Sequence, residues 1–175
     1  MLSHRNFTAF LAGLDSTEDA RFNKNDVILS YLPLPHILER ELVYVVLFAG
    51  GRVVYYSGDT AKIKDDLALV KPTIFVSVPR LFSRFYDVIQ KKFEEIQGYT
   101  KSALNYGLSK KLNNVSTNGG YTHRVYDRIF FNKTKSALGG NVRLMVSGSA
   151  PLLPDVHKFL KVVMGAPLLE AYGQT

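Results

Sequence analysis

The stretch VRLMVSGSAPLLPDVHKFLKVVMGAPLLEAY, residues 142–172, decides the fold class. Apolar and β-branched residues at 142–147 predict a buried strand, and Pro154 suits the first position of a helix over 154–164. The apolar run at 167–172 predicts a second strand. A strand, a helix and a strand in this order are typical of a parallel unit, so the stretch predicts an α/β fold.

The same alternation extends toward the N-terminus. Strands are predicted over residues 26–32, 52–57 and 73–78, and helices over 36–49, 59–70, from Pro79 to a break at Gly98, from there to about Leu112, and over 121–138. The buried face of the helix that begins at Pro79 is predicted from helical spacing as Leu81, Phe85, Val88, Ile89, Phe93 and Ile96. The segment NNVSTNGG, residues 113–120, is predicted to be a loop. The pattern indicates a largely parallel sheet with flanking helices.

Composition excludes several classes of protein. The 175 residues are 46% apolar and 21% charged, which fits one folded domain. No apolar run approaches the roughly 20 residues of a membrane span, and no signal peptide is recognised. The absence of cysteine excludes disulfides, thiolate zinc sites and a thiol nucleophile. No two histidines have the spacing of a helical metal site, so a metal site is not expected.

The net charge of +7 allows an anionic partner, either a nucleic acid or a membrane surface. Basic residues are nevertheless interleaved with acidic ones, as in KIKDD at 62–66, and no run of five like charges occurs. This distribution favours a solvated basic surface, and we do not expect a nucleic-acid partner.

Ligands of parallel α/β sheets bind beyond the carboxyl ends of the strands. The loops in question are residues 32–36, 57–60, 78–80, 147–151 and 172–175. In SGSAPLLPD, residues 147–155, Gly148 permits close approach of a ligand to the backbone, although an ordinary strand–helix turn has the same composition. A hydrolase elbow is excluded, because that motif needs G-x-S-x-G and here Gly148 directly precedes Ser149.

Two further loops carry candidate residues. In EAYGQT, residues 170–175, an aromatic ring and a hydroxyl could stack on a base and bond a phosphate, although Tyr-Gly turns are common. In YLPLPHILER, residues 31–40, His36 follows two prolines at the start of a helix. A structural histidine is the simpler interpretation of His36 taken alone.

Taken together, these segments resemble a known family. YLPLPHILER, KPTIFVSVPRLFSRFYD, FFNKTKSALGGNVRLMVSGSAPL and LLEAYGQT resemble, in order and spacing, the adenylate-forming enzymes, and most of all the long-chain acyl-CoA synthetases (fatty acid–CoA ligases). FFNKTKSALGGNVR favours that branch over luciferases and peptide-synthetase adenylation domains. The resemblance covers the whole chain and implies part of the large N-terminal domain of that fold. In that family a carboxylate attacks the α-phosphate of ATP, and coenzyme A then displaces AMP from the acyl-adenylate.

The resemblance also implies roles for residues of this chain. His36 would lie near the substrate carboxylate and the acyl entrance, and Thr175 would bond the α-phosphate. The implied nucleotide-binding residues are Gly148, Ser149 and Ala150 against the adenine and the acyl group, Glu170 and Ala171 at the adenine, Tyr172 stacked on it, and the adjoining Gly173, Gln174 and Thr175. Arg40 occupies the position of an aromatic gate in some relatives, so we assign no gate.

The expected domain organisation is a single incomplete AMP-binding segment, residues 1–175. It would lie between the phosphate-binding loop and the Tyr-Gly-x-Thr motif, without the C-terminal domain. The magnesium-binding glutamate of the family would follow Thr175, so no metal ligand is expected within the chain, and the isolated chain is expected to be inactive.

The implied partners are a long-chain fatty acid, ATP with Mg²⁺, and coenzyme A. The resemblance implies an intracellular enzyme at endoplasmic reticulum, mitochondrial or peroxisomal membranes, attached through segments outside this chain. Two other functions are compatible with the residues: a standalone nucleotide-binding α/β module without catalysis, and a basic surface-binding protein.

Overall fold

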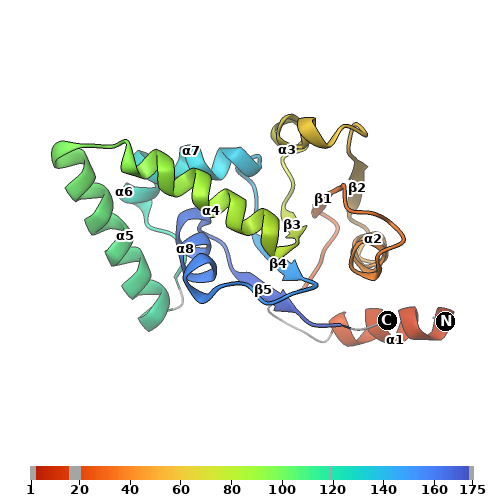
Figure 1. Cartoon of the computed structure of the whole chain (residues 1–175). Coiled ribbons are helices and arrows are strands. Elements are labelled where there is room, and N and C mark those ends of the chain that lie inside the picture. The colour runs from red at the N-terminus through yellow and green to blue at the C-terminus, as the bar shows by residue number, and fades with distance from the viewer. Residues whose placement is uncertain (1–2, 16–20, 119, 174–175) are drawn as a thin grey trace.

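The computed structural model describes residues 3–15, 21–118 and 120–173, in which short strands alternate with helices (Figure 1). The strands are β1 (Val27–Ser30), β2 (Arg52–Tyr55), β3 (Ile74–Ser77), β4 (Leu144–Gly148) and β5 (Leu168–Ala171). The longer helices are α1 (His4–Asp15), α2 (Ile37–Phe48), α3 (Ile63–Val70), α4 (Pro79–Glu94), α5 (Gly98–Asn118) and α8 (Pro154–Met164). Shorter helical segments are η2 (Thr60–Lys62), α6 (Arg124–Tyr126), η3 (Asp127–Phe131), α7 (Asn132–Lys135) and η4 (Ser136–Leu138).

All strand pairs are parallel, which confirms the predicted α/β class. The strands form two sheets, with β1 beside β2 in one and the order β3-β4-β5 in the other. Thr73 connects the sheets at the start of β3, because its backbone N–H donates to the Val27 carbonyl at 2.9 Å and its hydroxyl accepts from the Val27 N–H at 2.9 Å. The two sheets therefore lie side by side.

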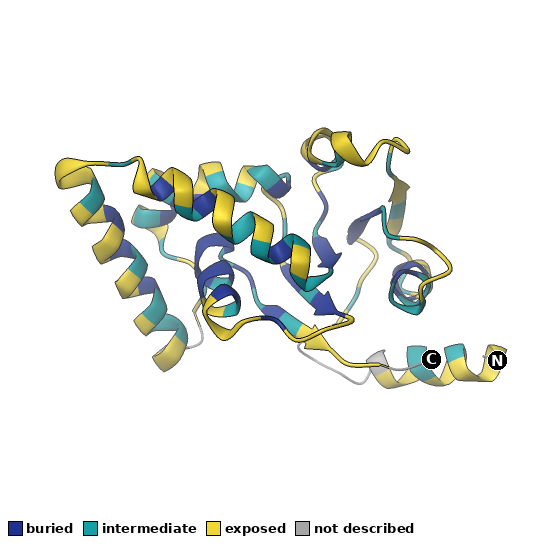
Figure 2. Cartoon of the chain, in the orientation of Figure 1, coloured by how far each residue is buried: buried dark blue, intermediate teal, exposed yellow. Residues whose placement is uncertain are grey.

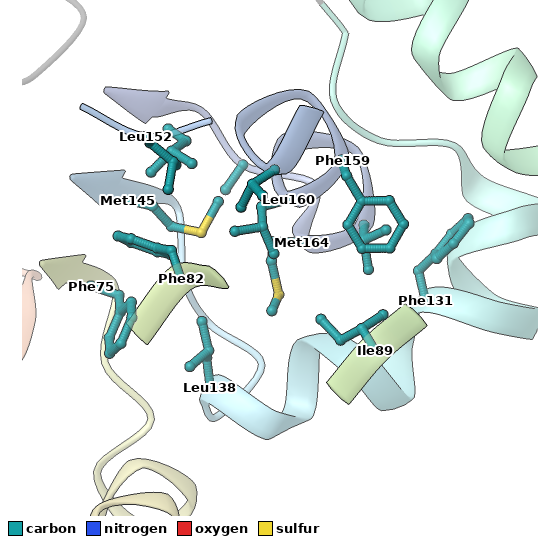
Figure 3. Close-up of a cluster of buried hydrophobic side chains, with 14 of the residues drawn as sticks. Phe75, Phe82, Ile89, Phe131, Leu138, Met145, Leu152, Phe159, Leu160 and Met164 are labelled. Carbon is teal, nitrogen blue, oxygen red and sulfur yellow. The ribbon is translucent and has the colours of Figure 1, made fainter. Parts of the chain in front are cut away.

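Alternating side chains of the three-stranded sheet enter two apolar layers. Ile74, Val76 and Leu144 pack with α2 on one face. On the other face, Phe75 and Met145 pack with the apolar sides of α4 and α8 (Figure 3). Figure 2 shows this burial on the strands and inner helix faces, whereas α5 exposes much of its surface.

The predicted loop at 113–120 is wrong for most of its length, because α5 continues to Asn118. Serine and threonine can remain in a helix when their hydroxyls bond the carbonyl one turn earlier. Ser116 donates to the Leu112 carbonyl at 3.1 Å, and Thr117 donates to the Asn113 carbonyl at 2.9 Å. These bonds satisfy the polar residues that suggested a loop.

Other boundaries also differ from the prediction. On α4, Phe82 is buried and the predicted core residue Val88 is exposed. The helix predicted over 121–138 begins at Arg124, and its π-helical turn η3 buries both Asp127 and Phe131. Helix α1 was not predicted. No helix in the described part of the chain is both long and apolar enough to span a bilayer.

Candidate functional site

A cavity of about 250 Å³ lies between α2 and the β3-β4-β5 sheet, and we call it the α2 pocket. The pocket is lined by Phe10, Phe22, His36, Ile37, Leu38, Glu41, Leu42, Val45, Val76, Leu144, Val146, Ser149, Leu169, Glu170, Ala171, Tyr172 and Gly173. Its body is mostly apolar. His36, Ser149, Glu170 and Tyr172 lie near the ends of β4 and β5, whereas Glu41 lies on α2. The pocket therefore occupies the edge at which parallel sheets bind ligands.

The fold brings together three of the five predicted loops. His36 from the loop after β1, Ser149 from the loop after β4, and Glu170 to Gly173 at the end of β5 all line the pocket. Among the described residues, the loops at 57–60 and 78–80 contribute no lining residue. Ala150 is exposed and does not line the pocket. Gln174 and Thr175 lie outside the described residues.

His36 caps α2 and points its other ring nitrogen toward Ser149. Its Nδ1 accepts a hydrogen bond from the Leu38 N–H at 3.2 Å, so the proton of the neutral ring belongs on Nε2. Nε2 lies 3.4 Å from the Ser149 hydroxyl oxygen. In this tautomer His36 is a donor at the pocket mouth, which suits a bound oxyanion and does not suit removal of the Ser149 proton.

Ser149 has a strained backbone, with φ at +76°. A residue other than glycine in this left-handed region carries a conformational penalty, and such positions gather at functional sites. The strain therefore supports a role for the Ser149 side chain at the pocket mouth.

We expect Ser149→Gly to raise the free energy of unfolding by about 1 kcal/mol, because glycine adopts this φ without penalty. Ser149→Ala retains the strain and is the matched control, with little change expected. Urea unfolding of the two variants measures the difference. Equal stability of Ser149→Gly and Ser149→Ala would contradict a strained backbone at this position.

Gly148, for which the resemblance implies a ligand contact, is buried and does not line the pocket, and its role in this structure is one of packing. A Cβ atom at this position would lie 2.9 Å from Cδ2 of Leu38, a side chain on the first turn of α2. Glycine thus lets the start of α2 approach the end of β4. This approach brings His36 close to Ser149.

Two candidate residues near the end of β5 have different environments: Glu170 forms a structural hydrogen bond, and Tyr172 is exposed. The Glu170 carboxylate accepts from the Leu152 N–H at 3.2 Å and so holds the loop after β4 against β5. Tyr172 is 89% exposed, which leaves its ring free to stack on a planar ligand. The interpretation of Tyr172 as a stacking residue is consistent with this exposure.

The pocket wall on α2 was not predicted from the sequence. This wall consists of Ile37, Leu38, Glu41, Leu42 and Val45, which fall at helical spacing. The spacing indicates one helix face, but it does not distinguish a face that packs fully from one that borders a cavity.

Comparisons with known proteins identify the family of this chain. The family model described as AMP-binding enzyme matches residues 1–175. This chain belongs to the AMP-binding enzyme family. It is 41% identical to the peroxisomal long chain acyl-CoA synthetase 6 of Arabidopsis thaliana and 37% identical to long-chain-fatty-acid–CoA ligase 5 of Rattus norvegicus. Each match covers 100% of this chain and 24% or 26% of the relative, so the chain spans about a quarter of these relatives.

Solved structures of this family show the same fold. MatB of Rhodopseudomonas palustris in its apo form matches with a TM-score of 0.61 at 27% identity, over 100% of this chain and 26% of that one. The A-PCP didomain of carboxylic acid reductase from Segniliparus rugosus, solved with AMP, matches with a TM-score of 0.68 at 21% identity, over 100% of this chain and 22% of that one. The predicted adenylate-forming fold is therefore confirmed.

Proposed function

We propose that this chain carries the acyl- and adenine-binding part of an ATP-dependent long-chain fatty acid–CoA ligase. The observation that carries the proposal is the α2 pocket, whose apolar body opens at a mouth containing His36, Ser149 and Tyr172. An apolar body suits a hydrocarbon chain, and a mouth with a donor and an exposed ring suits a carboxylate joined to an adenylate. Long-chain acyl-CoA synthetases among the relatives support this assignment.

Each residue at the pocket mouth would contact a different part of the ligand. Nε2–H of His36 donates to the carboxylate or acyl-phosphate oxygen, and Ser149 supplies a second hydroxyl contact. Tyr172 stacks on the adenine. Coenzyme A is the acceptor of the acyl group in this proposal.

Magnesium does not fit the described part of this site. Among the described residues, no group of three or more acidic or histidine side chains is placed to hold a metal ion. We therefore derive no step through Mg²⁺, which the family resemblance associates with ATP.

We expect Tyr172→Ala to weaken binding of a non-hydrolysable acyl-adenylate analogue by roughly tenfold or more, because base–aromatic stacking is lost. Isothermal titration of the 175-residue chain measures this affinity. Tyr99→Ala is the matched control, because Tyr99 is 96% exposed on α5 and does not line the pocket. Equal affinities of the two variants would place the adenine away from Tyr172.

A further inference from the structure

One charged side chain interrupts the apolar wall that α2 contributes to the α2 pocket. The pocket-lining positions Ile37, Leu38, Leu42 and Val45 on α2 are all apolar, and Glu41 lies among them on the same helix face. The opposite wall, formed by the sheet, is apolar at Val146 and Leu169, and its own carboxylate, Glu170 near the end of β5, already accepts a hydrogen bond from the Leu152 N–H. Glu41 is therefore a carboxyl group set beside a hydrocarbon cavity.

A second glutamate on α2, Glu39, has a structural hydrogen-bond partner and serves as a comparison for Glu41. Glu39 is buried, and its carboxylate accepts a hydrogen bond from the Ser30 hydroxyl at 2.5 Å. Glu41, in contrast, has neither a hydrogen bond nor an ion pair with any residue in the ranges 3–15, 21–118 and 120–173. Burial also raises the pKa of the Glu41 carboxyl above its usual value. Its acceptor oxygens thus remain available to a ligand.

Helix geometry gives the spacing between His36 and Glu41 along α2. His36 caps α2 and Glu41 follows five residues later, so the two lie about 7.5 Å apart along the helix axis. For an extended acyl chain that runs along α2 with its carboxyl end near His36, this spacing corresponds to roughly six carbons joined by bonds of about 1.5 Å. Glu41 would therefore face the middle of an acyl chain, well away from its reacting carboxyl group.

We propose that Glu41 makes the α2 pocket selective for acyl chains that carry a hydroxyl group near mid-chain over unsubstituted saturated chains. The proposal rests on the proposed acyl-binding function of this pocket. A mid-chain hydroxyl donates to the Glu41 carboxylate, and a hydrogen bond to a charged group is stronger than one between neutral groups. A saturated chain offers no donor and removes water from the carboxylate, which weakens its binding.

The test compares two ligands and two variants. The probes are hexadecanoic acid and hexadecanoic acid hydroxylated at carbon seven, and each competes with a fluorescent fatty acid for the 175-residue chain. Hexadecanoic acid hydroxylated at its last carbon is the positional control. The variants are Glu41→Leu, which removes the acceptor, and Glu41→Gln, which keeps the size of the side chain but removes its charge. If Glu41→Leu does not fold, Glu41→Gln still tests the role of the carboxylate. Glu94→Leu, at an exposed position at the end of α4, is the matched surface control.

We expect the wild-type chain to bind the mid-chain hydroxy acid about tenfold more tightly than hexadecanoic acid. In Glu41→Leu the order should reverse, with hexadecanoic acid bound about tenfold more tightly than by the wild type. Glu41→Gln should show an intermediate preference, and Glu94→Leu should behave as the wild type.

Three outcomes would overturn the proposal, and they are distinguishable. Binding of both acids with the same preference in the wild type and in Glu41→Leu would refute the role of Glu41 and leave the acyl-binding function standing. Binding of neither acid to the folded wild type and to folded Glu41→Gln would refute both the selectivity and the acyl-binding function. A preference for the terminal hydroxyl over the mid-chain one would also refute the proposed position.

Discussion

Replacing Asp127 with alanine is expected to lower the free energy of unfolding by about 3 kcal/mol. Among the described residues, Asp127 is the one carboxylate that pairs with the ammonium groups of buried Lys111 and half-buried Lys135. The Asp127 carboxylate accepts from the ammonium groups of Lys111 and Lys135 and from the His123 N–H at 3.0 Å. Lys111 is 1% exposed and also lies 4.6 Å from the Phe131 ring centroid. Without Asp127, this ammonium group has no counterion in the described part of the chain.

The cost is limited by the titration of Lys111. Burial lowers the pKa of Lys111 although Asp127 opposes that shift, so the variant can release part of the penalty by losing the proton. Urea unfolding measures the loss. Asp87→Ala, at an exposed position of α4, is the matched control with an expected change within about 0.5 kcal/mol. A loss below about 1 kcal/mol for Asp127→Ala would contradict the interpretation that this ion cluster is buried away from water.

The same carboxylate predicts a pH dependence. Burial alone would raise the pKa of Asp127, but the hydrogen bonds from Lys111 and Lys135 outweigh it, and the pKa is lowered. A lowered pKa in the folded state contributes stability above the unfolded pKa of about 3.9 and loses it as the pH falls through the folded pKa. Acid unfolding below about pH 4 should therefore be less steep in Asp127→Ala than in the wild type.

Asp26→Ala is expected to cost about 3 kcal/mol, because one buried carboxylate joins the starts of three strands. Asp26 lies just before β1, Thr73 just before β3 and Arg143 just before β4. The carboxylate accepts from Nε and one terminal nitrogen of Arg143 at 2.8 and 2.6 Å, and from the Thr73 hydroxyl at 2.8 Å. Its side chain is only 2% exposed, so water cannot replace these contacts in the folded state.

Variants of the arginine sharpen this prediction. Arg143→Lys cannot form the two-pronged contact, so it should lose about 1 kcal/mol or more and should not behave as a conservative change. Binding of an acyl-adenylate analogue provides a second readout. β1 leads into α2 with His36, whereas β4 and β5 carry Ser149 and Tyr172, so loosening Asp26 should also weaken ligand binding. Full retention of stability in Asp26→Ala would contradict the proposed joint between the sheets.

The sequence by itself determined the elements whose signals are local. Helix α8 occupies the predicted residues 154–164, because Pro154 sets its start and Gly165, with φ at +66°, sets its end. His36 was predicted at a helix start, and it caps α2. Local signals failed at 113–118, because Ser116 and Thr117 find carbonyls within their own helix.

Only the tertiary structure decided which of these elements meet. Ser149 and His36 are 113 positions apart, and their contact depends on the order of the strands and on the close approach of Leu38 to Gly148. Glu41 has the local pattern of any polar residue on an amphipathic helix, and only the cavity beside it gives it a function to test. Helical periodicity and turn residues act over a few neighbours, whereas a pocket is made by non-local packing. The sequence therefore allowed prediction of the residues at the pocket mouth, but not of the pocket wall on α2.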